Sequence, residues 1–457
     1  MKKVLATVAA LGLVFGVAAN ALALDQPARA SESEADTAPR VPKPTAPGVA
    51  LWSVAGHWVL AGAYLQDGLG RPGGADVQDL SDSNDAFYIY SFKILPVLQV
   101  NDKIAVKAEI RFDDRTVFGG EQSKDAGARD ADFKHLYMEW TSPWGKTRFG
   151  RTPAGAWAGE FMNSTGQGDR LMWWPNMLPE NWGMLLFTQK ITENDAGDIA
   201  QADGDVDGYY VDLSYKADFG KTIVALWTVR NAMAEVADEA LTTTQFRLYG
   251  NYNFDALNIE YELNWDFGDG PSEIGGAKSD RNAIGFELDA SYKMQDWTMG
   301  GLFFYMSGDD DPNDNDSKAM FAKSNGVGKD YNPYQIMTGD YMNLLNGDNP
   351  LSPGCNDVFF TQGSSGVWSL GGYVKYAMSP ELSLGGEIGY FAATDEPDGW
   401  DDEMGWEFGV GMGYKIMDNL TYNAHFSYLS TGDFFKAGGD TGNDDVYLLA
   451  HALSMKF

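Results

Sequence analysis

The feature that most constrains this chain is a one-by-one alternation of apolar and polar residues along segments of about ten to twelve residues. In 257–267, the apolar Leu257, Ile259, Tyr261, Leu263, Trp265 and Phe267 alternate with Asn258, Glu260, Glu262, Asn264 and Asp266. The segments 104–113, 284–293 and 420–428 repeat the pattern. Because successive side chains of a strand point to opposite faces, each segment predicts a strand between two different environments.

The length of these segments and of their connections distinguishes a soluble β-sandwich from a transmembrane β-barrel. A soluble β-sandwich also alternates, but its strands average about five or six residues, whereas a tilted strand that crosses a bilayer needs about nine to eleven. Short turns at positions such as 101–102 and 255–256 alternate with long polar connections such as 114–130 and 309–363. Short periplasmic turns and long outer loops are typical of outer-membrane barrels. The sequence therefore predicts an all-β, transmembrane antiparallel β-barrel over 51–457.

The number of strands follows from the two ends of the barrel. If the first strand starts in the periplasm and the last strand ends there, the number of strands is even. Seventeen alternating segments can be counted, and 169–175 supplies one more, which gives eighteen. Sixteen strands is the alternative, if 182–192 folds into a loop.

Composition excludes several classes of protein. The net charge of -32 and the pI near 4.3 argue against nucleic acid as a partner, since phosphate binding needs clustered Lys and Arg. Beyond the N-terminus no run reaches the roughly 18 apolar residues of a membrane-spanning helix. The single cysteine, Cys355, cannot form an internal disulfide, and four scattered histidines give no zinc-site spacing.

The first fifty residues predict two segments outside the barrel. Lys2 and Lys3 precede an apolar stretch over 4–19 and an Ala-x-Ala sequence at 21–23, which is the pattern of a cleaved secretory signal peptide over 1–23. Residues 24–50 carry five prolines among small and charged residues, so they have little to bury and predict a periplasmic linker.

The middle and the end of the chain resemble a known family. Phe149-Gly150-Arg151 closes one strand, a loop over about 152–168 follows, and an Arg-containing strand then ends at Trp174-Pro175. Together with the terminal Phe457, this order resembles the homotrimeric outer-membrane porins of Gram-negative bacteria of the sulfate-reducing type. The Pro-rich 24–50 and the long 309–363 depart from that pattern, which leaves the strand number and the pore shape open.

The resemblance implies a function and partners. It implies a trimeric, water-filled channel for passive diffusion of small hydrophilic solutes and ions, embedded in outer-membrane lipid and lipopolysaccharide. It also implies an inward-folded third loop and recognition of Phe457 as an insertion signal by the barrel assembly machinery. No cofactor and no enzymatic activity are expected.

The candidate site is a charged constriction, where fixed charges select the ions that pass. In porins of this kind a basic wall faces acidic residues of the third loop. The candidate residues are Lys107, Arg111, Lys134, Lys146, Arg148, Arg151, Glu160, Asp169 and Arg170. The alternative is that several of them form solvated salt bridges on the wall, away from the narrowest point.

Other interpretations stay open at this stage. The acidic 203–208 matches half of an EF-hand, but Ser214 stands where the bidentate Glu belongs, so no metal site is predicted. A hydrolase lacks any Gly-x-Ser-x-Gly or His-Glu-x-x-His motif, although a Ser–His pair could still assemble across strands. A structural barrel with a plugged lumen that anchors envelope layers is the remaining alternative. Apolar residues of the long loop are expected to pack on the rim or on a neighbouring subunit; they are Tyr334, Ile336, Met337, Tyr341, Met342, Leu344 and Leu345.

Overall fold

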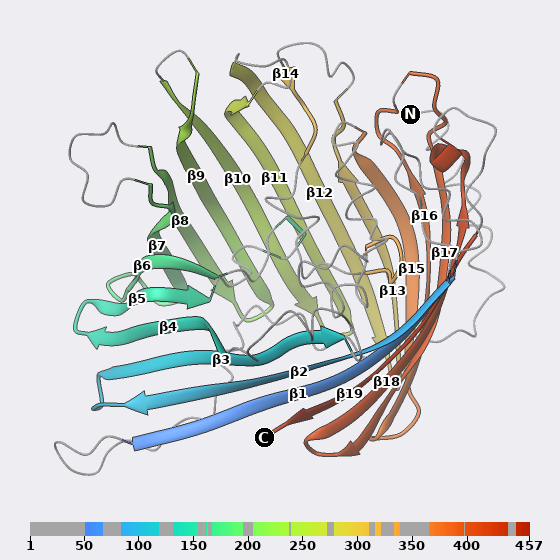
Figure 1. Ribbon diagram of the computed structural model, residues 1–457, viewed down its shortest axis with the longest axis horizontal. Coiled ribbons are helices and arrows are strands. Elements are labelled where there is room, and N and C mark those ends of the chain that lie inside the picture. The colour runs from blue at the N-terminus through green and yellow to red at the C-terminus, as the bar shows by residue number, and fades with distance from the viewer. Residues whose placement is uncertain are drawn as a thin grey trace.

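The computed structural model describes residues 51–66, 84–117, 131–153, 159, 161–162, 167–194, 204–236, 239–271, 278–309, 316–320, 333–338, 365–396, 398–436 and 445–457. Nearly all of them lie in strands (Figure 1). The strands are β1 (Leu51–Gln66), β2 (Asn84–Gln99), β3 (Ile104–Val117), β4 (Ala131–Ser142), β5 (Gly145–Pro153), β6 (Gln167–Pro175), β7 (Trp182–Thr192), β8 (Val206–Ala217), β9 (Gly220–Val236), β10 (Glu239–Phe254), β11 (Leu257–Pro271), β12 (Lys278–Met294), β13 (Trp297–Met306), β14 (Asp316–Ser317), β15 (Val367–Ala377), β16 (Leu382–Ala392), β17 (Glu403–Met417), β18 (Leu420–Thr431) and β19 (Val446–Lys456). One 3-10 turn, η2 (Asp433–Lys436), follows β18.

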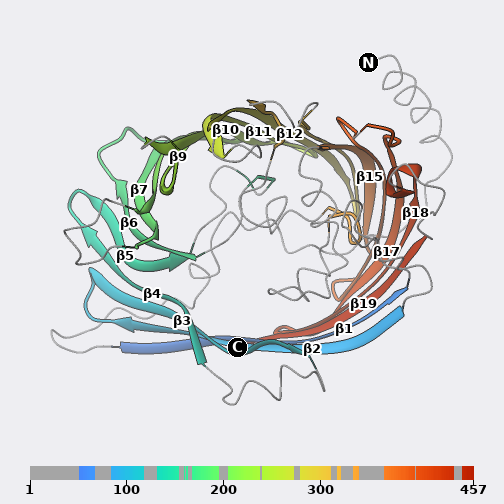
Figure 2. The ribbon, with the colours of Figure 1, turned by 45° about the horizontal axis from the view of Figure 1, so that its top comes forward.

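The strands form one closed antiparallel ring (Figure 2). Each strand pairs with its neighbours in the sequence, and β1 pairs with both β2 and β19, which closes the sheet. The two-residue β14 pairs parallel with β12 and stands outside the ring, because β13 pairs directly with β15. Eighteen strands therefore build the barrel, as predicted. Both β6 and β7 belong to the ring, so the sixteen-strand alternative is wrong.

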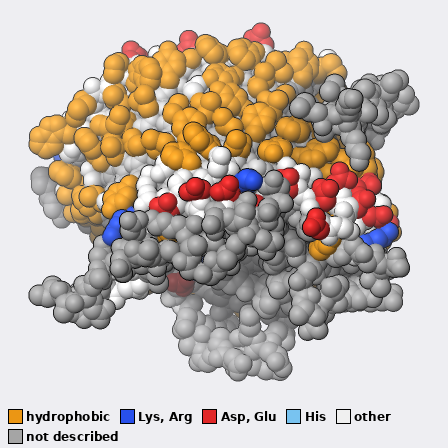
Figure 3. Space-filling model, turned by 90° about the horizontal axis from the view of Figure 1, so that it is seen from above, with side chains coloured by type: hydrophobic (Ala, Val, Ile, Leu, Met, Phe, Trp, Pro, Cys, Tyr) orange, Lys and Arg blue, Asp and Glu red, His pale blue; other side chains and the backbone are white. Residues whose placement is uncertain are grey.

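The two faces of the sheet meet opposite surroundings. On β11 the outward Trp265 is 43% exposed, whereas the inward Glu262 and Asn264 are fully buried. On the face seen in Figure 3, hydrophobic side chains form a broad area over the strands, and acidic and basic residues collect along its margin. An exposed apolar outside around a polar inside reverses the arrangement of a soluble protein and suits a barrel in lipid. No helix among the described residues is long and apolar enough to cross a membrane.

The ends of the barrel differ as the sequence predicts. Turns of two to six residues close one end, and two of the two-residue turns place a residue with positive φ, at Asp255 and Gln295 (both 55°), as tight hairpins require. At the same end Phe457 seals the junction of β1 and β19, because its backbone exchanges hydrogen bonds with Gly56 at 2.8 and 3.0 Å. The predicted signal peptide, the linker and Cys355 lie outside the described residues.

Candidate functional site

Alternate basic and acidic side chains line the inner face of β3, β4 and β5. Lys107 and Arg148 both contact the carboxylate of Glu139, at 3.2 and 2.8 Å. Arg111 contacts Glu109 at 2.6 Å, and His135 lies 3.2 Å from the other oxygen of Glu109. The sequence predicts Lys107, Arg111 and Arg148 as site residues but does not point to Glu109 and Glu139, although these two carboxylates hold the cations in place.

Aromatic rings also contact several of the basic side chains. The guanidinium of Arg148 lies 5.1 Å from the ring of Trp174, and Lys146 lies 4.5 Å from the same ring. Arg170, one strand further, lies 5.5 Å from the ring of Phe187. Such cation–π contacts strengthen where water is excluded, and Arg148 and Arg170 are only 3% and 8% exposed.

Five of the nine predicted residues therefore share the inner face of β3, β5 and β6. This basic wall consists of Lys107, Arg111, Lys146, Arg148 and Arg170.

The other four predicted residues do not join the basic wall. Arg151 and Asp169 form an ion pair at 3.7 Å on the face of β5 and β6 that also carries the exposed Phe149 and Leu171. Their prediction as constriction residues does not fit this outward placement, because one step along a strand reverses the face. Lys134 pairs with its neighbour Asp132 at 2.7 Å, at a register shift between β3 and β4. Glu160 lies outside the described residues.

Part of the third loop, which joins β5 and β6, enters the barrel and is held by β11, five places further round the ring. Glu262 of β11 accepts hydrogen bonds from the backbone N–H groups of Phe161 and Met162, at 3.0 and 3.2 Å. Asn264 donates a further hydrogen bond to the same carboxylate at 2.7 Å. Gly159 has φ +89°, and a Cβ there would fall on an oxygen of Glu262, so glycine is required at this close approach. Gly159, Phe161 and Met162, which we call the third-loop segment, therefore lie against the inner wall, and the inward fold of 152–168 as a whole stays a prediction.

A second segment enters from the long loop over 309–363. Glu407 of β17 accepts hydrogen bonds from the consecutive backbone N–H groups of Gln335, Ile336 and Met337, at 2.9, 2.8 and 2.7 Å. Three converging amides form a strong anion-binding concavity. Residues 333–338, the seventh-loop segment, therefore bind the inner wall (Figure 2).

The seventh-loop segment also inserts an aromatic side chain into the wall. Tyr334 packs edge-on against Phe391 and over Gly371 and Gly389, where a Cβ would lie 1.9 and 2.5 Å from its ring or hydroxyl. Burial raises the pKa of the Tyr334 hydroxyl well above its usual value. The sequence predicts Tyr334, Ile336 and Met337 on the rim or at a subunit contact, whereas all three are buried against the inner wall. The other four predicted residues of this loop lie outside the described residues.

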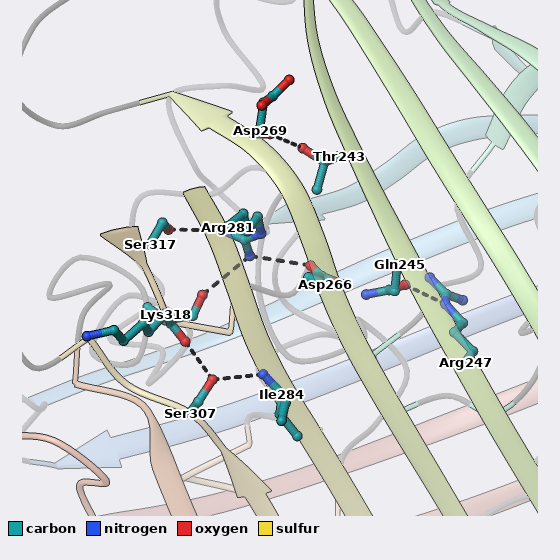
Figure 4. A network of polar contacts seen from close by, with 11 residues as sticks. Thr243, Gln245, Arg247, Asp266, Asp269, Arg281, Ile284, Ser307, Ser317 and Lys318 are labelled. Atoms are coloured by element: carbon teal, nitrogen blue, oxygen red, sulfur yellow. Dashed lines mark hydrogen bonds and ion pairs between the residues drawn. The ribbon is translucent and has the colours of Figure 1, made fainter. Parts of the chain in front are cut away.

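A third connection ties the start of the long loop to the wall (Figure 4). Arg281 of β12 contacts Asp266 of β11 and also donates to Ser317 and to the carbonyl oxygen of Ala319, all at 3.3 Å. Ser307 accepts from the backbone of Ile284 and donates to the carbonyl oxygen of Lys318. The long loop is therefore fixed at two places, next to β12 and at Glu407.

Below the seventh-loop segment, toward the end with the short turns, the lumen contains a cavity of about 630 Å³. Residues of eight strands, from β8 to β16, form its wall, and Pro333, Tyr334 and Gln335 form its roof. The inward loop segments thus narrow the barrel without filling it.

The histidine–serine contacts bear on the hydrolase alternative. His425 Nε2 lies 2.9 Å from Ser427 Oγ and 3.2 Å from a carboxylate oxygen of Glu387. Both partners meet the same ring nitrogen, whereas a catalytic triad needs the acid at one nitrogen and the nucleophile at the other. His57 contacts Ser454 at 2.7 Å through Nε2. The contacts of His425 therefore do not have the geometry of a catalytic triad.

Comparison with known proteins identifies the fold. No protein-family model and no curated protein matches the sequence. The chain is similar to solved structures from Pseudomonas aeruginosa: OccK9 (OpdG) with a TM-score of 0.55 and 13% identity, and OccK8 (OprE) with 0.55 and 10%, each over 89% of this chain and 98% of that one. The structure of OpdK with vanillate, from the same organism, matches with a TM-score of 0.54 and 11% identity over the same shares. The shared feature is the barrel architecture.

Proposed function

We propose that this protein is an outer-membrane channel for passive diffusion of small hydrophilic solutes and ions. The observation that carries the proposal is a closed barrel, apolar outside, whose charged lumen is narrowed by two anchored loop segments and still contains a cavity of about 630 Å³. A pore of this construction selects by size at the loop segments and by charge at the wall. The barrel fold that the chain shares with OpdK, an outer-membrane protein, supports the location.

The distribution of charged residues around the lumen supports selection of solutes by charge. In a ring of eighteen strands, β12 and β16 lie nine places from β3 and β6. The basic wall on β3, β5 and β6 is therefore on the side of the ring opposite the strands that carry Glu287 and Asp289 (β12) and Glu387 (β16). Opposed walls of opposite sign create a transverse field, which favours small anions and dipolar solutes over apolar solutes of the same size.

Three further parts of the proposal rest on the sequence. They are export through the signal peptide over 1–23, insertion by the barrel assembly machinery through Phe457, and assembly into a homotrimer in lipopolysaccharide-containing membrane. A heat-labile, SDS-resistant band near three times the mature mass would support the trimer. A monomer in native mass spectrometry from mild detergent would contradict it.

Planar-bilayer recording tests the function itself. Purified protein should insert in discrete steps of constant conductance in KCl, with a conductance that scales with salt concentration. A folded, heat-modifiable barrel that inserts without conductance would instead support the structural barrel with a plugged lumen.

A further inference from the structure

The wall of the lumen cavity carries a continuous series of polar residues whose charge changes from positive to negative along the series. Strand register places Lys216 opposite Lys221, Lys221 opposite Asn251, Asn251 opposite Glu260, and Glu260 opposite Asp289. All five line the cavity. We call these residues, on β8 to β12, the charge row.

The charge row is positive at one end and negative at the other. Lys216 and Lys221 occupy β8 and β9, and Asp218 of the connecting turn is the acid beside them. Glu260 and Asp289 occupy β11 and β12, followed by Glu387 on β16, with Lys375 of β15 as the base among them. The neutral Asn251 separates the two ends and donates to Glu260 at 2.7 Å. Neighbouring strands lie about 4.8 Å apart, so the distance along the wall from β9 to β12 is roughly 14 Å.

The acidic end also presents hydrogen-bond acceptors. Asp289 accepts a hydrogen bond from the Tyr373 hydroxyl at 2.8 Å, which fixes the orientation of its carboxylate. In the roof of the cavity, Gln335 is only 4% exposed, and its side-chain oxygen has no hydrogen-bond donor among the described residues. A buried amide oxygen without a donor favours a ligand that brings N–H or O–H groups.

From this arrangement we infer that the cavity is a binding site for an extended zwitterion, a solute with an ammonium group at one end and a carboxylate several bonds away at the other. The ammonium lies toward Asp289 and Gln335, and the carboxylate lies toward Lys216 and Lys221. The inference rests on the proposed function, because it names the class of solute that such a channel would retain on its way through. The volume suits a small solute, since ligand pockets usually measure about 300–1,000 Å³.

Three probes of equal chain length test the contribution of each charge. 6-Aminohexanoate carries both charges, hexanoate carries only the carboxylate, and hexylammonium carries only the ammonium. Isothermal titration calorimetry on the detergent-solubilised protein measures binding without requiring conduction. The wild type should bind 6-aminohexanoate at least about tenfold more tightly than either singly charged probe, which corresponds to about 1.4 kcal/mol. In bilayers the same probe should interrupt the KCl current for longer than the other two.

Two variants test which end of the charge row binds which charged group of the zwitterion. Asp289→Asn should reduce zwitterion binding to the level of hexanoate, and the double change Lys216→Gln with Lys221→Gln should reduce it to the level of hexylammonium. Glu381→Gln, in an exposed turn at the same end of the barrel and outside the cavity lining, is the control and should leave binding unchanged. Heat modifiability of each variant on SDS gels verifies that the barrel is folded.

Equal affinity of the wild type for the three probes would overturn the inference, as would equal losses for all probes in both variants. A conducting channel without discrimination refutes the zwitterion site and leaves the proposed function intact. A barrel that discriminates in calorimetry but never conducts refutes the proposed function and leaves the site.

Discussion

The carboxylate of Glu262 accepts the backbone N–H of Phe161 at 3.0 Å, across 101 residues of sequence. Because Phe161 belongs to a loop and Glu262 to the wall, this contact converts a connecting segment into a fixed part of the lumen. Glu407 does the same for the seventh-loop segment. Hydrogen bonds to a buried carboxylate contribute about 1.5–3 kcal/mol each, so both segments are held firmly against the inner wall.

The first prediction concerns Glu262. Glu262→Ala removes the acceptor of two buried amides, so the third-loop segment should leave the wall and the single-channel conductance should rise with increased current noise. The barrel should lose on the order of 2–4 kcal/mol of stability, read from the temperature at which the folded band disappears on SDS gels. Glu381→Ala is the control in an exposed turn. Unchanged conductance in a folded Glu262→Ala barrel would show that the third-loop segment does not narrow the conducting path.

The second prediction concerns the glycines below Tyr334. In Gly389→Ala, the new Cβ would lie 2.5 Å from the tyrosine ring, so Tyr334 should be displaced at a cost of about 1–3 kcal/mol and the conductance should change. Gly301→Ala is the matched control, because its Cβ would meet nothing closer than 3.8 Å. Equal conductance and equal thermal stability of the two variants would contradict the packing of Tyr334 over Gly389.

The third prediction concerns ion selectivity. The double change Arg111→Ala with Arg148→Ala should shift the zero-current potential in a salt gradient toward cation preference and enlarge the effective pore, because Glu109 and Glu139 then lose their arginine partners. The outer acidic residues have less influence, since screening limits them to about 8 Å at physiological ionic strength. Arg151→Ala should change neither quantity, because this side chain lies on the outward face. An unchanged potential in the double variant would remove the basic wall from the selectivity filter.

The fourth prediction concerns the long loop. Deletion of 325–350 removes the seventh-loop segment and leaves the carboxylate of Glu407 without its three amides, so conductance should increase or the assembly should lose heat stability. Combining the deletion with Glu407→Gln should restore part of the stability, because a neutral side chain costs less to bury unpaired. If neither conductance nor heat stability responds to the deletion, the loop is only a solvated flap.

Much of the fold could be predicted from local pattern. The alternation in 257–267 predicts β11 because each step along a strand changes the environment of the side chain, and the short turn at 255–256 fixes the hairpin before it. The same alternation puts Arg148 and Arg151, three residues apart on β5, on opposite faces of the sheet, so nearness in sequence alone does not predict a place in the lumen.

The anchoring of the loops could not be predicted in this way. Glu262 and Glu407 look like ordinary polar residues of alternating strands, and the loop residues that they bind lie 101 and about 70 residues away. No local pattern encodes a contact between a wall carboxylate and the main chain of a loop, because any residue supplies an amide. The apolar residues of the long loop did signal burial, but the burial site was set by glycines on strands distant in sequence.

The junction between β1 and β19 has a consequence for biogenesis. His57 and Ser454 contact each other at 2.7 Å although 397 residues separate them, so the sheet cannot close by adding hairpins alone. Until these two strands meet, the growing sheet has two unpaired edges, each able to pair with any other extended chain. Closing so large a loop is entropically slow, which lengthens that exposed period. A factor that shields or templates these edges would therefore govern how much of the newly made chain reaches the folded state instead of aggregating.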